Sequence, residues 1–183
     1  MYLLLHICCG VCLGGPFESL RNTKVRIQGY FYNPNIHPFA EFMGRMDALR
    51  ILQEAQGISI RYEEGYGLED FLRDALPNDE HRCLRCYRMR LRRTAQRAKE
   101  MGCDAFSTTL LVSRHQKHEL IRQAGTEAAQ EFGIPFHYED WRPLNLKSFE
   151  AAKSSAIYRQ RYCGCIFSEY EASRRQNDRR IAR

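Results

Sequence analysis

The sequence predicts an α/β fold in which a parallel sheet of about five strands is covered by helices on both faces and followed by a helical C-terminal extension. Three observations predict it. Short apolar runs alternate with longer amphipathic segments along the chain. Glycines 57, 102 and 133 follow three of the longer segments, as glycines commonly follow helices. The 183 residues show no repeat, low-complexity tract or long linker, so we expect residues 1–183 to form one domain.

The individual elements follow from local composition. The predicted strands cover residues 3–7, 25–32, 58–62, 105–110 and 135–138. The predicted helices cover residues 16–22, 38–56, 68–76, 83–101 and 115–132, with more helix after residue 138. Strands that alternate with helices are joined by right-handed crossovers into a parallel, Rossmann-like sheet.

Three unusual stretches follow predicted strands. Cys8 and Cys9 end the first strand, Asn33-Pro34-Asn35 is a strong turn signal after the second, and Thr108-Thr109 ends the fourth. Ligands of parallel sheets bind at the carboxyl ends of the strands. The sequence therefore predicts that these three stretches meet at one edge of the sheet and form the functional site.

Composition limits the class of protein. The apolar run at residues 2–7 is short and lacks a basic flank, and no segment approaches the roughly 20 apolar residues that span a bilayer. We therefore expect a cytoplasmic protein without membrane contact. The net charge of +6 permits a polyanionic partner without establishing one.

Seven of the eight cysteines fall into three groups, Cys8-Cys9-Gly-Val-Cys12, Cys83-Leu-Arg-Cys86 and Cys163-Gly-Cys165. In a reducing compartment, such cysteines mark metal binding or redox chemistry more often than disulfides. Adjacent cysteines together with a distant Cys-x-x-Cys pair supply four thiolates, which fits a [4Fe–4S] cluster, and zinc is the alternative. Cys103 stands alone and is interpreted as a small buried hydrophobe.

The second and third cysteine groups carry further signals. Cys86, Arg90, Arg93 and Arg97 share one face of the predicted helix, which is either a solvated arginine face or a track for nucleic-acid phosphates. Cys163 and Cys165 are separated by one glycine and could close a small, strained disulfide, which is readily reduced. We interpret them as a redox-active pair, with metal ligation as the competing role.

These stretches together resemble a known family. They are His6-Ile-Cys8-Cys9-Gly-Val-Cys12, Tyr32-Asn-Pro-Asn-Ile-His-Pro38, Arg82-Cys-Leu-Arg-Cys-Tyr87, Asp104-Ala-Phe-Ser-Thr-Thr-Leu-Leu111, Ser113-Arg-His-Gln116 and Tyr158-Arg-Gln-Arg-Tyr-Cys-Gly-Cys165. In this order they are similar to the cobalamin-independent epoxyqueuosine reductases of the QueH type. Gly10-Val11 stands where many members have Ala-Pro, and Arg114 where proline is common.

The resemblance implies a function and a cofactor. The family reduces the epoxide of epoxyqueuosine, at the wobble position of tRNA, to the alkene of queuosine, the last step of queuosine synthesis. It implies a fold similar to the adenine-nucleotide α-hydrolase (HUP) group, a [4Fe–4S] cluster and, in some members, a second mononuclear iron. The cluster ligands map onto Cys8, Cys9, Cys83 and Cys86, and the redox-active pair onto Cys163 and Cys165. We assign Cys12 to the second iron.

The resemblance also implies binding partners, and we expect further site residues. The partners implied are tRNA and an electron-donor protein such as a ferredoxin or flavodoxin, with no use of cobalamin. The candidate proton donors are His115, Tyr162 and Asp104. The candidate substrate contacts are Asn33 and His37 at the ring hydroxyls and Arg90, Arg93 and Arg97 at the phosphates.

Two alternatives stay open. A tRNA sulfur-insertion enzyme would activate the base with ATP through a Ser-Gly-Gly-x-Asp-Ser loop, whereas this chain has Cys8-Cys9-Gly-Val-Cys-Leu-Gly-Gly15 after its first strand. We therefore expect no ATP use. A non-catalytic iron–sulfur sensor that binds nucleic acid would need no substrate pocket, and the polar turn at residues 33–37 argues against it.

Overall fold

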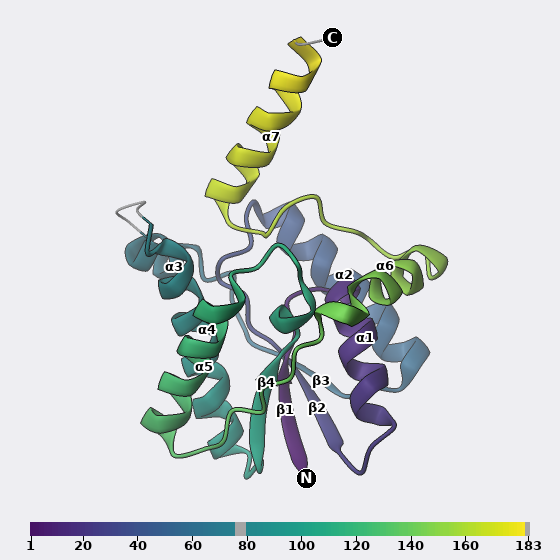
Figure 1. Ribbon diagram of the computed structural model, residues 1–183, viewed down its shortest axis with the longest axis vertical. Helices are drawn as coiled ribbons and strands as arrows, with labels where there is room; N and C mark the ends of the chain where they lie inside the picture. Colours follow the sequence, from purple (N-terminus) through teal and green to yellow (C-terminus); the bar gives the residue numbers. More distant parts are fainter. Residues whose placement is uncertain (76–79, 182–183) are drawn as a thin grey trace.

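The computed structural model describes residues 1–75 and 80–181 and contains one four-stranded parallel sheet (Figure 1). Its strands are β1 (Tyr2–His6), β2 (Arg26–Phe31), β3 (Ile60–Tyr62) and β4 (Ala105–Thr108), in the order β3-β2-β1-β4. β1 is one of the two inner strands, and its Leu3, Leu4 and Leu5 are fully buried, as expected of a strand covered on both faces.

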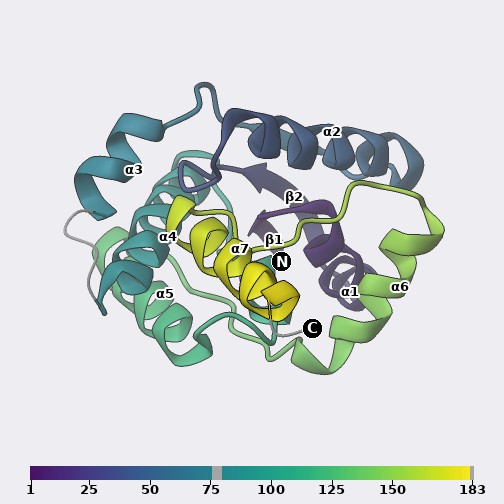
Figure 2. The same ribbon diagram turned by 90° about the horizontal axis from the view of Figure 1, so that it is seen from above.

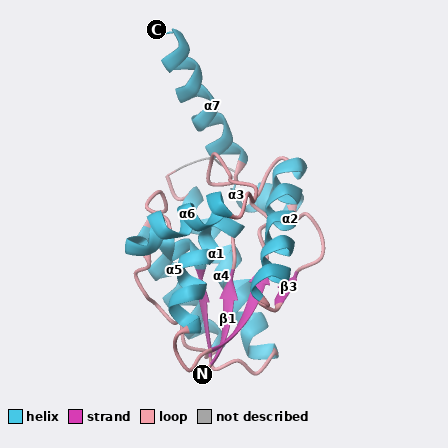
Figure 3. Cartoon of the chain, turned by 90° about the vertical axis from the view of Figure 1, so that its right-hand side faces the viewer, coloured by secondary structure: helices cyan, strands magenta, loops and turns pink. Residues whose placement is uncertain are grey.

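Helices cover both faces of the sheet (Figures 1 and 2). One layer contains α1 (Gly10–Arg21), α2 (Phe39–Gln56) and α6 (Asn145–Ser154), and the other contains α4 (Arg82–Glu100) and α5 (His118–Phe132). The remaining helical elements are α3 (Leu68–Ala75), the 3₁₀ turns η1 (Thr109–Val112) and η2 (Arg142–Leu144), and α7 (Ile166–Ile181). α7 projects away from the two layers, which confirms the helical extension (Figure 3). None of the described helices is long and apolar enough to cross a membrane.

The sheet has four strands rather than the predicted five. Residues 135–138 do not form a strand, and Phe136 makes only an isolated parallel bridge with Phe106 of β4. In this bridge the Phe106 N–H donates to the Pro135 carbonyl, and the His137 N–H donates to the Phe106 carbonyl. Pro135 has no N–H to donate, so the pairing does not extend into a strand.

Two helices begin at other residues than predicted. α1 begins at Gly10 instead of residue 16, because the sulfur of Cys9 accepts the backbone N–H of Cys12 at 3.3 Å and caps the helix. Pro16 therefore lies inside α1. α5 begins at His118 instead of residue 115, because the chain after β4 first forms η1. Residue 76, predicted to end the third helix, lies outside the described residues.

The glycine-based helix ends are confirmed. Gly57 and Gly133 cap α2 and α5 with φ of 65° and 63°, in the left-handed region that glycine tolerates best. Gly102, one residue past the cap of α4, has φ of 66°.

Gly14 and Gly15 are neighbours in α1, and substitutions at these two positions can test how closely α6 and the turn before it pack against α1. A Cβ on Gly15 would lie 2.5 Å from Ser148 Oγ and 2.8 Å from Leu144 Cβ, whereas one on Gly14 would meet only ordinary contacts at 3.6 Å or more. We expect Gly15→Ala to lower the free energy of unfolding by about 1–3 kcal/mol through overpacking. Gly14→Ala should be neutral or stabilise by up to about 1 kcal/mol, because alanine favours helix. Urea denaturation measures both, and equal effects would contradict this packing.

Candidate active site

The three unusual stretches meet at the carboxyl edge of the sheet, as predicted. β1 and β4 are adjacent although they are far apart in sequence, so the strand order reverses between them, which is where ligands bind in open α/β sheets. The N–H of Cys8 donates to Thr109 Oγ1 at 3.2 Å, which links the ends of these two strands. Asn33 Nδ2 donates to the Ile7 carbonyl at 2.8 Å and holds the turn after β2 beside them.

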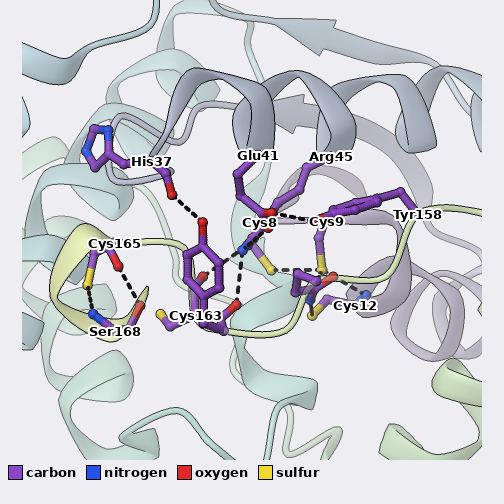
Figure 4. Close-up of polar contacts among 12 residues, drawn as sticks. Cys8, Cys9, Cys12, His37, Glu41, Arg45, Tyr158, Cys163, Cys165 and Ser168 are labelled. Carbon is purple, nitrogen blue, oxygen red and sulfur yellow. Dashed lines mark hydrogen bonds and ion pairs between the residues drawn. The ribbon is translucent and has the colours of Figure 1, made fainter. Parts of the chain in front are cut away.

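Cys8, Cys9 and Cys12 form a compact buried group of thiols (Figure 4). Their sulfurs all lie within 4.8 Å of one another, and those of Cys8 and Cys9 are 3.8 Å apart. Two thiolates on one tetrahedral ion with metal–sulfur bonds of ~2.3 Å are separated by roughly the same distance. Thiolates are the ligands that zinc and iron–sulfur clusters prefer, so this group can hold a metal ion or part of a cluster.

The three thiols differ in acidity. Hydrogen bonds from Cys12 and Cys9 hold the pKa of Cys8 well below its ordinary value. Burial raises the pKa of Cys9. The hydrogen bond between Cys12 and Cys8 raises the pKa of Cys12. Cys8 is therefore the most acidic of the three thiols, and a thiolate is the form that binds metals.

Cys83 and Cys86 lie in the first two turns of α4 and are not part of this compact group. Cys86 accepts a hydrogen bond from Arg90 Nη2 at 3.3 Å. Arg90 is 1% exposed. Burial alone would lower the pKa of Arg90, but negative charge at Cys86, Cys163 and Cys8 outweighs it and raises that pKa. Arg90 thus contacts Cys86 and lies close enough to Cys163 and Cys8 to interact with charge on them.

The loop that carries Cys163 and Cys165 is fixed to α2 by Arg45. The buried Arg45 guanidinium donates to the carbonyls of Tyr162 and Cys163, both at 3.0 Å, and pairs with Glu41 at 2.7 Å. Tyr158 donates its hydroxyl proton to the same Glu41 (Figure 4). The Glu41–Arg45 ion pair therefore holds the loop at two places, at Tyr158 and at Tyr162-Cys163.

Cys163 and Cys165 are free thiols in this structure. Gly164, between them, has φ of 131°, and a Cβ there would lie 3.1–3.3 Å from Ile36 and Arg45. Only glycine fits this conformation and this close approach. Cys163 is exposed and accepts a hydrogen bond from Gln116 Nε2 at 3.2 Å.

The three predicted proton donors, Tyr162, His115 and Asp104, lie in different parts of the structure. Tyr162 lies in the cysteine loop, and its hydroxyl donates to the His37 carbonyl at 2.5 Å. His115 is exposed, and the neighbouring Gln116 is the residue of that loop that contacts a thiol. Asp104 is wrong as a proton donor, because its carboxylate accepts the N–H of Tyr2 at the start of β1. A five-residue strand separates it from Cys8, on the order of 15 Å at ~3.3 Å per residue.

Of the predicted substrate contacts, two have polar atoms beside the site that are unpaired among the described residues, and the arginines are already paired or buried. Asn33 and His37 are buried beside the site, and Asn33 Oδ1 and His37 Nε2 have no hydrogen-bond partner within the described part of the chain. Arg93 and Arg97 both pair with Glu63. Arg90 is wrong as a member of a surface track, because its guanidinium is buried against Cys86.

Three residues of the site were not predicted: Arg45, Glu41 and Gln160. Glu41 and Arg45 have the i, i+4 spacing of an ordinary surface ion pair, so the sequence gives no sign of their burial. Gln160 Nε2 donates to the Cys9 sulfur at 2.8 Å, although 150 residues lie between them. Thr109 was noted at the strand end but was not assigned to the Cys8 sulfur, which lies 3.5 Å from its hydroxyl.

The fold and site define an α/β protein with a buried group of cysteines at its sheet edge that can hold a metal ion or part of a cluster. The family model described as "Epoxyqueuosine reductase QueH" matches residues 3–171. The chain belongs to this family of oxidoreductases.

Individual relatives agree with this assignment. The epoxyqueuosine reductase QueH of Dehalococcoides mccartyi is 38% identical over 92% of this chain and 93% of its own length. That of Thermotoga maritima is 32% identical over 99% and 96%. That of Helicobacter pylori is 34% identical over 91% of this chain but only 49% of its own length. Among solved structures, a deacetylase–teicoplanin complex covers 85% of this chain at 12% identity with a TM-score of 0.48, which is too weak to indicate a shared fold or function.

We expect Arg45→Met to loosen the loop of Cys163 and Cys165. The substitution leaves the Glu41 carboxylate buried without its cation, so the free energy of unfolding should fall by about 3–5 kcal/mol, and alkylation of Cys165 should become faster. Arg50→Gln, which removes an exposed ion pair of the same helix, should cost less than about 1 kcal/mol and leave the alkylation rate unchanged. Equal alkylation rates in both variants would show that Arg45 does not hold the loop.

Protonation of His37 should weaken the fold at acidic pH. Burial lowers the pKa of His37 to about 4, against about 6.5 in an unfolded chain. Between these values the unfolded chain binds more protons, so stability is retained above pH 6.5 and is lost as pH falls toward 4. Burial lowers the pKa of His6 to about 4 as well, which adds a loss of the same sign. His37→Asn should therefore lose less stability than the wild type between pH 7 and pH 4.5, and equal losses in urea denaturation would contradict this.

Proposed function

We propose that this protein reduces the epoxide of epoxyqueuosine in tRNA to the alkene of queuosine. The observation that carries the proposal is the group of Cys8, Cys9 and Cys12 at the carboxyl edge of the sheet, in a chain that belongs to the epoxyqueuosine reductase QueH family. The relatives that share most of its length carry the same name. We further propose that residues 1–183 act as one domain, of adenine-nucleotide α-hydrolase type, in the cytoplasm.

We assign Cys8, Cys9, Cys83 and Cys86 as ligands of a [4Fe–4S] cluster and Cys12 as a ligand of a second iron. The donor set supports this, because Cys8, Cys9 and Cys12 lie at the start of α1, Cys83 and Cys86 lie in the first turns of α4, and the buried guanidinium groups of Arg45 and Arg90 interact with charge on these thiols. When bound, such a centre supplies single electrons, and an iron beside it acts as a Lewis acid.

The residues Cys163 and Cys165 match the electron balance of the reaction. Conversion of an epoxide to an alkene consumes two electrons and two protons and releases the oxygen as water. Oxidation of two thiols to one disulfide releases two electrons and two protons. We therefore propose that this pair cycles between dithiol and disulfide, and that an electron-donor protein such as a ferredoxin or flavodoxin restores the dithiol.

Proton delivery and substrate contact are assigned to residues near this pair. Tyr162 is the first candidate donor, and burial raises the pKa of its phenol, so the phenol stays protonated at neutral pH. His115 is the second candidate donor. We propose that the unpaired Asn33 Oδ1 and His37 Nε2 meet the ring hydroxyls of the substrate. Arg93 and Arg97 stay candidate phosphate contacts.

The test is anaerobic turnover. We expect the protein, reconstituted with iron and sulfide and mixed with epoxyqueuosine-containing tRNA and dithionite, to remove one oxygen from the modified base, as measured by nucleoside mass spectrometry. Cys83→Ala should abolish turnover because a cluster ligand is lost. Cys103→Ala, which changes a cysteine beside β4 at the opposite edge, should leave turnover unchanged.

A fully iron-loaded protein that leaves epoxyqueuosine unchanged would contradict the proposal and favour sulfur insertion or sensing. Full activity of Cys83→Ala would contradict the assigned ligands but leave the reaction in place.

A further inference from the structure

The arginines of α4 do not offer free positive charge to a partner. Arg88 pairs with Glu127, Arg92 with Glu131, and Arg93 and Arg97 with Glu63. These ion pairs join α4 to α5 and to the residue after β3. Charge that is already compensated within the fold adds little to the binding of an anion, because the internal pair must be broken first.

Uncompensated positive charge gathers instead along α7. A groove of about 710 Å³ is lined by Arg161, Ala172, Arg175, Gln176, Arg179 and Arg180. The five α7 residues follow the spacing i, i+3, i+4, i+7 and i+8, so they form one face of the helix. No salt bridge within residues 1–75 and 80–181 involves any of the four arginines of this groove.

The base of α7 is fixed beside the redox cysteines. The sulfur of Cys165 accepts the N–H of Ser168 at 3.4 Å, and the Cys165 carbonyl accepts the Ser168 hydroxyl at 2.7 Å. Glu171 pairs with Arg82 at the start of α4, next to Cys83. The first turns of α7 are therefore held against the site, while the arginine-bearing turns project from it (Figures 1 and 3).

We propose that this groove, lined by Arg161 and the arginine face of α7, binds the phosphodiester backbone of the RNA substrate. The inference rests on the proposed function, which supplies a tRNA as the substrate. Arginine presents a planar fork that matches phosphate oxygens, and such contacts position a nucleic acid without reading its sequence. The groove thereby places the RNA strand beside Cys163 and Cys165.

The composition of the groove favours RNA over a protein partner. Among the described residues, Ala172 is the one apolar residue that lines the groove, whereas the buried centre of a protein–protein interface is apolar and depleted of charge. The family model ends at residue 171, so it includes Arg161 but not Arg175, Arg179 or Arg180.

The test compares two charge-matched double variants of the reconstituted protein. Arg175→Gln/Arg179→Gln removes two groove arginines, and Arg50→Gln/Arg122→Gln removes two exposed arginines that are paired with Asp47 and Glu119. Fluorescence anisotropy with an unmodified RNA anticodon stem–loop gives the affinity over a range of KCl concentrations. We expect the groove variant to bind about tenfold or more weakly at ~0.15 M salt, with the slope of log K against log[KCl] reduced by roughly 1.5 to 2. The control variant should match the wild type.

The outcomes separate this inference from the proposed function. A groove variant that binds RNA with the wild-type affinity and salt slope overturns the inference, even if the wild type reduces epoxyqueuosine. Loss of binding to an acidic ferredoxin, with RNA binding unchanged, overturns it in favour of a protein partner. A wild type that binds the stem–loop through the groove but leaves epoxyqueuosine intact supports the inference and contradicts the reaction instead.

Discussion

The site depends on the burial of negative charge on sulfur at the end of β1. An isolated charge inside a protein is costly unless an opposite charge and hydrogen bonds compensate it. Here Arg45 from α2 and Arg90 from α4 supply that compensation. These two helices cover opposite faces of the sheet, so the layered fold itself is required to bring both cations to the thiols (Figure 2). Burial alone would lower the pKa of Arg45, but negative charge at Cys9 and Glu41 outweighs it and raises that pKa.

Each cysteine group also lies at the amino-terminal end of a helix. The sulfur of Cys9 caps α1, Cys83 and Cys86 lie in the first turns of α4, and the sulfur of Cys165 accepts an N–H of the first turn of α7. Unpaired N–H groups and the helix dipole favour an anion at this end. Three helices thus direct their positive ends at one region of the sheet edge. The helix ends favour thiolate, whereas burial acts against it and raises the pKa of Cys86 to about 12 and that of Cys165 above its ordinary value.

The sequence alone predicted the parts that local chemistry determines. Strand β1, the glycine ends of α2 and α5, and the meeting of Cys8, Asn33 and Thr109 follow from apolar runs, turn residues and the topology of parallel sheets. It did not predict contacts that depend on tertiary packing. The helical spacing placed Cys86, Arg90, Arg93 and Arg97 on one face, but it did not show that Arg90 is buried or that Arg93 and Arg97 pair with Glu63. The cap made by Cys9 was missed because cysteine is not a usual capping residue.

The same packing determines where the protein can meet a large anion. Glutamates of α5 and Glu63 neutralise the arginines of α4, so these pairs join the elements of the fold. Within residues 1–75 and 80–181, no salt bridge involves Arg175, Arg179 or Arg180 of α7, so the charge of these arginines is not compensated there. Because Cys165 caps α7 and Arg45 holds the preceding residues on α2, the charged helix and the redox cysteines belong to one continuous, anchored segment. A strand bound along α7 is therefore held at a fixed position relative to Cys163, without any need for the rest of the surface to be basic.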